Sequence, residues 1–207
     1  MRTLVIDTAT EACSVALFQD DTCIAGDWRL LGRGHAESLV PMIAALPGKG
    51  RAERVAVSVG PGSFTGLRVG LAAARALCFA WGAKAVGYPT LALVSAIARE
   101  REGALPVTVA MTGGHGEWFV EGFDAEGASS APLASLRPDD AIRTDATELI
   151  AGSQAEAFVS RRGHGRALNL HPDARLFSLL PASVLLADPT PLYGRAPDAK
   201  LPTATAP

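Results

Sequence analysis

Residues 55–82, VAVSVGPGSFTGLRVGLAAARALCFAWG, decide the fold of this chain. The run opens with three valines at alternate positions, which favour a buried strand, and the Gly-Pro-Gly turn at 60–62 ends that strand abruptly. Ser63 or Thr65 can then cap a helix that ends at Gly82, a good left-handed C-terminal residue. The sequence therefore predicts a strand, a tight turn and a helix in direct succession.

The predicted helix is apolar on nearly every side. Charge interrupts it only at Arg68 and Arg75, two turns apart. A helix that covers one side of a sheet needs a single apolar stripe, so a helix with two apolar rows needs a second cover. That cover is either a partner protein or a second layer of the same chain, and the helix alone does not separate these alternatives. One row consists of Leu67, Leu71, Ala74, Cys78 and Trp81, and the other of Val69, Ala72, Ala76, Phe79 and Ala80.

Small residues recur along the same helix at about one-turn spacing, at Gly66, Gly70 and Ala73 or Ala74. A glycine in a helix interior costs roughly 1 kcal/mol relative to alanine. Close approach of another backbone usually offsets such a cost. The small residues therefore predict tight packing against this helix.

Length and composition indicate an ordinary globular protein of one large domain or two small lobes. The 207 residues are 48% hydrophobic and 19% charged with a net charge of −2, which argues against nucleic-acid binding by this chain alone. Its three cysteines have no paired spacing, which fits a reducing, cytoplasmic setting. The N-terminus is too short and too polar for a signal sequence, and no run approaches the roughly 18 apolar residues of a membrane span.

Strand and helix patterns alternate through the first half of the chain, which is typical of an α/β unit with parallel pairing. Pro41 is tolerable in the first helix only if Ser38 lies near the N-cap. The second half carries weaker patterns. Strands are predicted at 3–7, 12–18, 23–31, 55–59, 84–89, 107–111, 117–124 and 155–160, and helices at 38–46, 65–81, 90–100, 145–151 and 181–188. The expected division is an N-terminal lobe at 1–103, a smaller C-terminal lobe at 104–195 and a disordered tail at 196–207.

The glycine turn invites a nucleotide-binding interpretation, which its spacing does not support. Gly60, Gly62 and Gly66 are one residue too far apart for the dinucleotide fingerprint, and the lysine of a Walker motif is missing. The four histidines are isolated, so no metal site is predicted. No GxSxG sequence is present either.

A group of weaker candidates fits either a nucleotide-binding loop or structural roles. The turn DTATE at 7–11 presents a carboxylate and hydroxyls that can cradle a phosphate, although Asp7 at a strand end is more often a turn or cap residue. His35 beside Glu37 is more often a hydrogen-bonding pair than a catalytic dyad, and Ser63 is better explained as a helix cap than as a nucleophile. The group consists of Asp7, Thr8, Thr10, His35, Glu37, Gly60, Gly62 and Ser63.

Four segments together resemble the TsaB family, also called YeaZ, of bacterial tRNA threonylcarbamoyladenosine biosynthesis. They are VIDTATEACSVAL at 5–17, HAESLVPMI at 35–43, GPGSFTGLRVG at 60–70 and PLYGR at 191–195. The resemblance implies an α/β fold of the two-lobed actin, sugar kinase and Hsp70 (ASKHA) type, with mixed sheets and a reduced second lobe. It also implies a non-catalytic partner of the paralogous transferase TsaD, which modifies N6 of adenosine 37 in tRNA. The sequence departs from the family in MTGGHG at 111–116 and in the ending Tyr193, Gly194 and Arg195.

The resemblance further implies that the pair forms through the first two helices, at about 38–46 and 65–81. A TsaE-like ATPase joins the pair, tRNA is reached only through the complex, and ATP or ADP is a candidate ligand at the junction. The chain has no cofactor of its own in this interpretation, and alone it forms a homodimer through the same face. The expected interface residues are Leu39, Met42, Ile43, Leu46, Gly66, Arg68, Gly70, Leu71, Ala74, Arg75 and Cys78.

Two alternatives stay open. One is an ATP-binding phosphotransferase or glycoprotease-like peptidase of the same fold that acts alone, through Asp7, Thr8, Thr10 and Ser63. The other is a homodimeric binding module for an unrelated partner. If the chain is a non-catalytic partner of the transferase, Leu71→Glu or Ala74→Glu is expected to abolish the complex and leave a folded chain.

Overall fold

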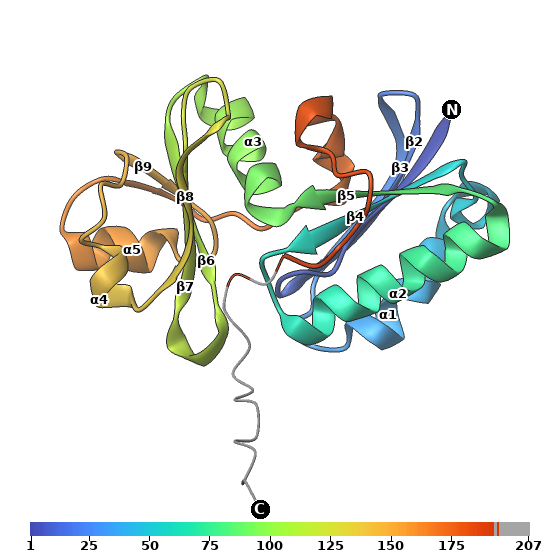
Figure 1. Cartoon of the computed structure of the whole chain (residues 1–207), viewed down its shortest axis with the longest axis horizontal. Coiled ribbons are helices and arrows are strands. Elements are labelled where there is room, and N and C mark those ends of the chain that lie inside the picture. The colour runs from blue at the N-terminus through green and yellow to red at the C-terminus, as the bar shows by residue number, and fades with distance from the viewer. Residues whose placement is uncertain (193, 195–207) are drawn as a thin grey trace, which may run out of the picture.

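The computed structural model describes residues 1–192 and 194. The chain forms two lobes, each built on a five-stranded mixed sheet, and helix α3 (Thr90–Glu102) lies between them (Figure 1). This confirms the two-lobed α/β fold that the sequence predicted. The predicted tail at 196–207, together with Tyr193 and Arg195, lies outside the described residues.

The first sheet has the strand order β3-β2-β1-β4-β5. β1, β2 and β3 pair antiparallel, whereas β4 pairs parallel with both β1 and β5. Helices α1 and α2 lie together on one face of this sheet (Figure 1), where they cover apolar side chains such as Leu4, Ile6 and Val57. The elements are β1 (Arg2–Asp7), β2 (Ala12–Gln19), β3 (Thr22–Leu30), α1 (His35–Ala45), β4 (Arg54–Gly60), α2 (Phe64–Trp81) and β5 (Lys84–Pro89).

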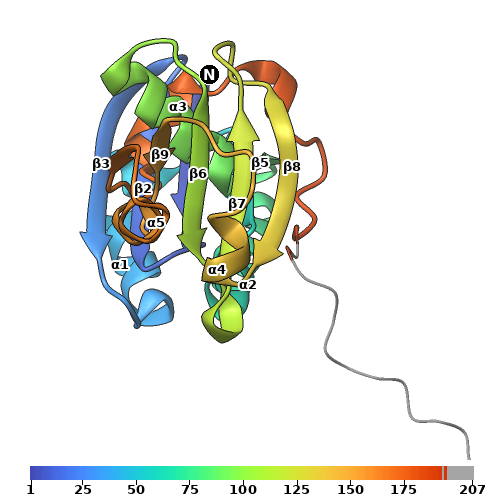
Figure 2. The ribbon, with the colours of Figure 1, turned by 90° about the vertical axis from the view of Figure 1, so that its left-hand side faces the viewer.

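The second sheet has the order β10-β9-β6-β7-β8. Figure 2 looks onto this lobe from its outer side, where α5 and α4 lie over the strands. Phe158 of α5 is fully buried and stacks on Trp118 of β7, with ring centres 6.0 Å apart. The elements are β6 (Val107–Thr112), β7 (Trp118–Phe123), β8 (Ser129–Leu136), α4 (Pro138–Ala141), β9 (Leu149–Ala151), α5 (Ala155–Arg162) and β10 (Arg166–Leu168).

One core joins the lobes, because α3 is buried by residues of both sheets and the chain then returns to the first lobe. The 3₁₀ helix η3 (Ala174–Leu179) brings Phe177 against Tyr88, with ring centres 5.4 Å apart. Further on, the backbone N–H of Leu192 donates to the carbonyl oxygen of Val59 at 2.7 Å. The division into 1–103 and 104–195 stays a prediction, and residues 174–192 lie against the first sheet.

The stretch at 55–82 folds as its sequence predicts. Ser63 caps α2 by accepting a hydrogen bond from the N–H of Gly66 at 3.3 Å, and Gly82 ends the helix with φ 66°. α1 differs from its prediction, since it begins at His35 after Gly34, which adopts φ 86°. Pro41 therefore lies inside the helix, where it cannot donate the N–H that would reach the carbonyl of Glu37.

The second half departs from the predicted elements at several positions, and α4, β10 and η3 were not predicted. The segment at 155–160 belongs to helix α5 and is not a strand, because Ala155 and Phe158 bury one helical face. The segment predicted as a helix at 145–151 contains strand β9, and only Ala182–Val184 of the helix predicted at 181–188 forms a short 3₁₀ turn. Strand β8 was not predicted, since its Ser, Ala and Pro residues carry no strand pattern.

Candidate functional site

Helix α2 has one face in the core and one in solvent. The row of Leu67, Leu71 and Ala74 is buried against the sheet. On the opposite side Phe79 is 94% exposed and Phe64 is 54% exposed. Within the described residues, the second cover that the sequence predicted is therefore not provided by this chain.

The exposed face of α2 also includes Thr65, Ala76 and Ala80, and within it we call one row the α2 stripe: Phe64, Arg68, Ala72, Arg75 and Phe79. At 3.6 residues per turn, these five positions fall within an arc of about 80°. The guanidinium carbon of Arg68 lies 3.6 Å from the ring centre of Phe64, so the cation and the ring are held together. An apolar stripe of this kind with arginines in it has the composition of a protein–protein contact surface.

Most of the residues predicted to form the interface are buried within this chain. Leu39, Met42, Ile43, Leu46, Gly66, Gly70, Leu71 and Ala74 are all buried inside this chain, whereas Arg68 and Arg75 are exposed and Cys78 is partly buried. Because Leu71 and Ala74 are 3% and 0% exposed, Glu at either position would place a charge in the chain's own core. In contrast to the expectation from the sequence, we therefore expect these variants to unfold.

Glycines of α2 and of the turn before it pack against residues 8 and 9 of the first hairpin. A Cβ atom at Gly66 would lie 2.1 Å from the carbonyl oxygen of Thr8, and one at Gly70 would lie 2.4 Å from the Thr8 hydroxyl oxygen. Similarly, a Cβ at Gly62 would lie 2.1 Å from the carbonyl oxygen of Ala9. The tight packing that the sequence predicts is therefore internal to the chain.

The hairpin at 7–11 is held by its own hydrogen bonds. Asp7 is fully buried, and its carboxylate accepts from the N–H of Ala9 at 3.0 Å and from the Tyr88 hydroxyl at 3.0 Å. Burial raises the pKa of Asp7 from 3.8 to about 6, against the lowering effect of these two hydrogen bonds. The Thr8 hydroxyl donates to the carbonyl of Gly66 at 2.7 Å, and the Thr10 hydroxyl accepts from the N–H of Ala12 at 3.2 Å.

A cleft of about 1200 Å³ lies between the lobes, beside the N-terminal end of α2. It brings together five of the weaker candidates, Thr10, His35, Glu37, Gly62 and Ser63, and leaves out Asp7, Thr8 and Gly60. Its other polar groups include Glu11 of the 7–11 turn and Thr112 and His115 of the 111–116 segment. Arg33 and Ser135 also line it, and no sequence pattern signals these two, because they come from segments that are far apart in the sequence.

The cleft does not assemble the catalytic pairs considered from the sequence. Nε2 of His35 lies 3.3 Å from the carbonyl oxygen of Ala12, so this ring contacts the backbone and not Glu37. Ser63 is occupied as the cap of α2. In the described part of the chain, no three His, Cys, Asp or Glu residues come together as a metal site would require. The loop at 111–116, which departs from the family pattern, borders the cleft, and its His115 adopts φ 57°.

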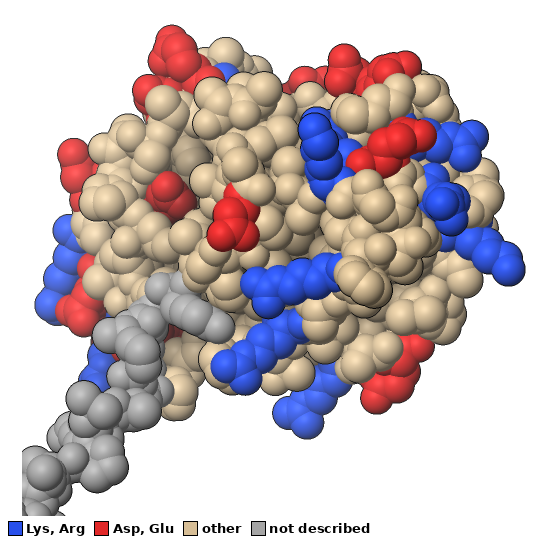
Figure 3. All heavy atoms as spheres, turned by 45° about the vertical axis from the view of Figure 1, so that its right-hand side comes forward, with Lys and Arg blue, Asp and Glu red and all other residues tan. Residues whose placement is uncertain are grey.

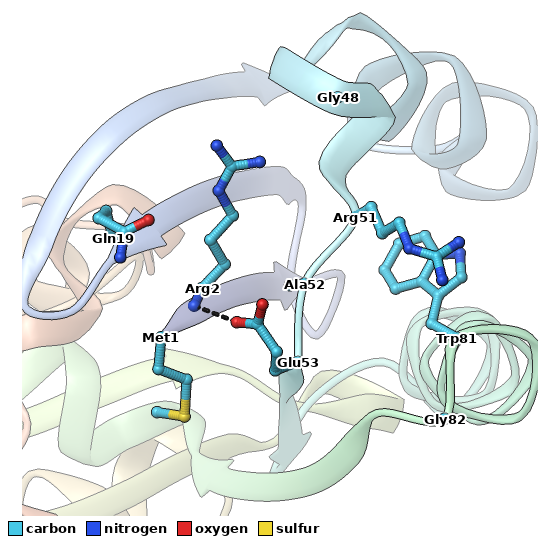
Figure 4. A pocket seen from close by; sticks show the side chains of 9 residues that line it. All are labelled: Met1, Arg2, Gln19, Gly48, Arg51, Ala52, Glu53, Trp81 and Gly82. Atoms are coloured by element: carbon cyan, nitrogen blue, oxygen red, sulfur yellow. Dashed lines mark hydrogen bonds between the residues drawn. The ribbon is translucent and has the colours of Figure 1, made fainter.

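A second hollow, of about 520 Å³, lies at the far end of the first sheet near the C-terminal end of α2 (Figure 4). Arg2 and Arg51 border it from different segments, and Trp81 lies on the same side as Arg51. The carboxylate of Glu53 accepts from the backbone N–H of Arg2. The hollow is thus lined by both charge signs.

None of the described helices has both the length and the apolar character needed to cross a membrane.

Comparison with known proteins identifies the family. The family model described as TsaD, tRNA N6-adenosine threonylcarbamoyltransferase, matches residues 29–142, more than half of the chain. This chain belongs to that family. Within the family it is similar to the TsaB, or YeaZ, proteins: "tRNA threonylcarbamoyladenosine biosynthesis protein TsaB" of Escherichia coli is 38% identical over 124 residues, which are 58% of this chain and 53% of that protein.

A solved structure of YeaZ from Pseudomonas aeruginosa has the same fold, with a TM-score of 0.75 and 26% identity over 93% of this chain and 99% of that one. A protein of Corynebacterium diphtheriae named tRNA N6-adenosine threonylcarbamoyltransferase is 36% identical over 91 residues, which are 42% of this chain and 26% of that protein. The chain spans about half the length of the E. coli relative. The relatives' names therefore include both a biosynthesis protein and the transferase itself.

Proposed function

We propose that this chain is a non-catalytic TsaB-type subunit in the synthesis of threonylcarbamoyladenosine in tRNA. In this proposal the α2 stripe docks the TsaD-type transferase, which performs the chemistry. The exposed stripe is the observation that carries the proposal, because it gathers two exposed phenylalanines on one helix face, and exposed apolar patches mark protein contact sites. The match to the TsaD family model and the likeness to TsaB proteins support the choice of a TsaD-type transferase as the partner.

The state of the candidate catalytic groups supports a scaffold role over an enzyme that acts alone. Asp7 is bonded to Ala9 and Tyr88, Thr8 to Gly66, and Ser63 to the first turn of α2. A nucleotide phosphate at the 7–11 hairpin would have to displace these contacts, and Ala9 and Thr8 already fill the space beside Gly62 and Gly66. ATP or ADP in the complex is therefore proposed to bind at the junction with the transferase.

We propose that the other partners bind the transferase and not this chain. A TsaE-type ATPase and the tRNA would join through the transferase, in the cytoplasm. This arrangement is consistent with a net charge of −2, which gives this chain little attraction of its own for RNA.

Reconstituted tRNA modification tests the proposal. The purified transferase, a TsaE-type ATPase and unmodified tRNA are supplied with threonylcarbamoyl-adenylate, with and without this chain. We expect modification to require the chain, and Phe79→Glu to lower the rate at limiting subunit concentration by about tenfold or more, since buried aromatic anchors dominate interfaces. Because Phe79 is exposed, the melting temperature of the variant should match that of the wild type.

Leu105→Glu is the matched control, since Leu105 is an exposed apolar residue at 41% and lies in the loop before β6, away from α2. It should support modification as well as the wild type. Modification that proceeds equally well without this chain would overturn the proposal. Turnover of ATP or of a peptide by the purified chain alone would favour the enzyme alternative instead.

A further inference from the structure

The three parallel strands of the first sheet begin at the same end, and each of them begins with a cation. Arg2 opens β1, Arg54 opens β4 and Lys84 opens β5, and the register pairs Arg54 with Lys84. Two further cations, Lys49 and Arg51, come just before β4. Figure 3, which turns the first lobe toward the viewer, shows Lys and Arg side chains that project from that lobe. The hollow of about 520 Å³ lies at this basic end of the sheet.

The charges that line the hollow do not balance. Arg2 and Arg51 line it, and neither guanidinium group has a hydrogen-bond or ion-pair partner among the described residues. Glu53 is the single acid among the described residues that line it, and its carboxylate accepts from the backbone N–H of Arg2 (Figure 4). Asp20 and Asp21, in the turn after β2, are exposed and do not line the hollow. Glu53 therefore holds the backbone of Arg2 and leaves its side chain unpaired.

The short turn η1 (Pro47–Gly50) forms part of the rim, and its backbone is unusual. Gly48, Lys49 and Gly50 follow one another with φ of 61°, 55° and 71°. This left-handed conformation is costly for a residue with a side chain, and such positions persist only where the surrounding structure imposes them. Packing holds the turn here, because a Cβ at buried Gly50 would lie 2.9 Å from Cγ2 of Ile43 on α1. The rim of the hollow is therefore a fixed piece of backbone.

Both arginines are placed by this turn. The N–H of Arg51 donates to the carbonyl oxygen of Gly48 at 3.2 Å. Nη1 of Arg2 lies 3.5 Å from the position that a Cβ on Gly48 would take, so its side chain reaches across to η1. Trp81, at the C-terminal end of α2, is partly buried and forms a further wall on the side of Arg51 (Figure 4). The hollow thus combines two unpaired guanidinium groups with an aromatic ring.

The geometry points to a binding site for a small phosphate ester that carries a planar group, such as a nucleotide. The phosphate accepts hydrogen bonds from Arg2 and Arg51, because the planar fork of a guanidinium group matches the oxygens of a phosphate. The planar group stacks on Trp81, as nucleobases do on aromatic side chains. The volume of about 520 Å³ lies within the range of about 300–1,000 Å³ that is usual for small-molecule pockets.

A single small ligand fits these observations better than an RNA strand does. A polyanion would meet the net charge of −2 and the exposed carboxylates of Asp20 and Asp21, which directly follow Gln19 at the edge of the hollow. The site is separate from the cleft between the lobes and from the hairpin at 7–11, where the sequence placed the nucleotide candidates. It opposes the expectation that the chain has no cofactor of its own, and it does not depend on the proposed function.

Isothermal titration calorimetry with ADP, inorganic phosphate and adenosine tests the site. The N-terminus must be free of any tag, because Met1 lines the hollow. We expect ADP to bind, and inorganic phosphate and adenosine each to bind about tenfold or more weakly, since each makes only part of the contacts. Added salt should weaken the binding of ADP, because Arg51 is exposed to solvent.

Substitutions locate the bound ADP. Arg2→Ala and Arg51→Ala should each weaken its binding about tenfold or more, because a hydrogen bond to a charged group is lost. Arg51→Lys should recover only part of this loss, since lysine lacks the planar fork. Trp81→Leu should weaken ADP more than inorganic phosphate, which does not reach the ring. Arg101→Ala removes an exposed cation on α3, away from the hollow, and should bind ADP like the wild type.

Melting temperatures confirm that each variant is folded. Binding of ADP that is unchanged in Arg2→Ala and Arg51→Ala would overturn the proposal. Weakening by Arg33→Ala instead would place ADP in the cleft between the lobes, which Arg33 lines, and would overturn it as well. So would the absence of ADP binding to the wild type at millimolar concentration, or tighter binding of a short single-stranded RNA than of ADP.

Discussion

The two faces of α2 have similar apolar composition and opposite roles. The inner face, with Leu67, Leu71 and Ala74, is buried against the first sheet, and the α2 stripe is exposed. The inner face also carries Gly66 and Gly70, which let Thr8 approach, whereas the stripe carries both arginines. Hydrophobicity therefore predicts only that a helix face will be covered. Glycines on a face indicate close packing within the chain, whereas arginines on it favour contact with another molecule.

The largest expected effect is the difference in the free energy of unfolding between a substitution on the inner face of α2 and one on the stripe. Leu71→Ala should lower the free energy of unfolding by about 2–5 kcal/mol, because it removes a buried side chain and leaves a cavity. Phe79→Ala should change it by less than about 0.5 kcal/mol, because the ring is exposed. Urea denaturation of both variants measures the difference. Comparable losses in the two variants would mean that the outer face is also packed.

Buried and exposed charged groups differ in the same way, since Asp7 is buried whereas Arg68 and Arg75 are exposed. Between pH 3.8 and about 6, folded Asp7 keeps a proton that the unfolded chain has released. Its contribution to stability is therefore complete below pH 3.8 and is lost as pH rises through 6, by about 3 kcal/mol in all. The free energy of unfolding of the wild type minus that of Asp7→Asn, measured from pH 3.5 to 7.5, should fall by about this amount. A difference that does not vary with pH would contradict the assigned pKa.

Exchanging glycine and alanine on each face of α2 should change the stability of the chain by a smaller amount. Helix propensity favours alanine by about 1 kcal/mol, so Ala72→Gly on the stripe should destabilise the chain by about that amount. Gly70→Ala should also destabilise it, by about 1–3 kcal/mol, because the new Cβ would overlap the Thr8 hydroxyl. Thermal denaturation decides the sign. A stabilised Gly70→Ala variant would show that Thr8 moves aside without loss.

The sequence contains the local signals of this fold and part of its site. The cap at Ser63 and the stop at Gly82 depend on neighbouring residues, so they are readable from sequence. Which apolar row of α2 faces inward depends on where the sheet lies. Arg68 and Arg75 were the one sequence feature that indicated the outward side of the helix. Helix α5 was mistaken for a strand because six residues are too few to distinguish the two periods. The cleft could not be predicted, since its residues meet only after both lobes have folded.

The smallest expected effect concerns how Arg68 is held. Its guanidinium lies over the ring of Phe64, and an exposed cation–π contact is worth about 0.5–1 kcal/mol. Phe64→Leu keeps an apolar side chain but removes the ring, so stability should fall by no more than that amount. If the ring orients Arg68 for a partner's carboxylate, the same variant should bind the transferase severalfold more weakly, whereas Phe64→Tyr should bind like the wild type. Equal weakening by Leu and Tyr would show that Phe64 acts through its contact area and not through the arginine.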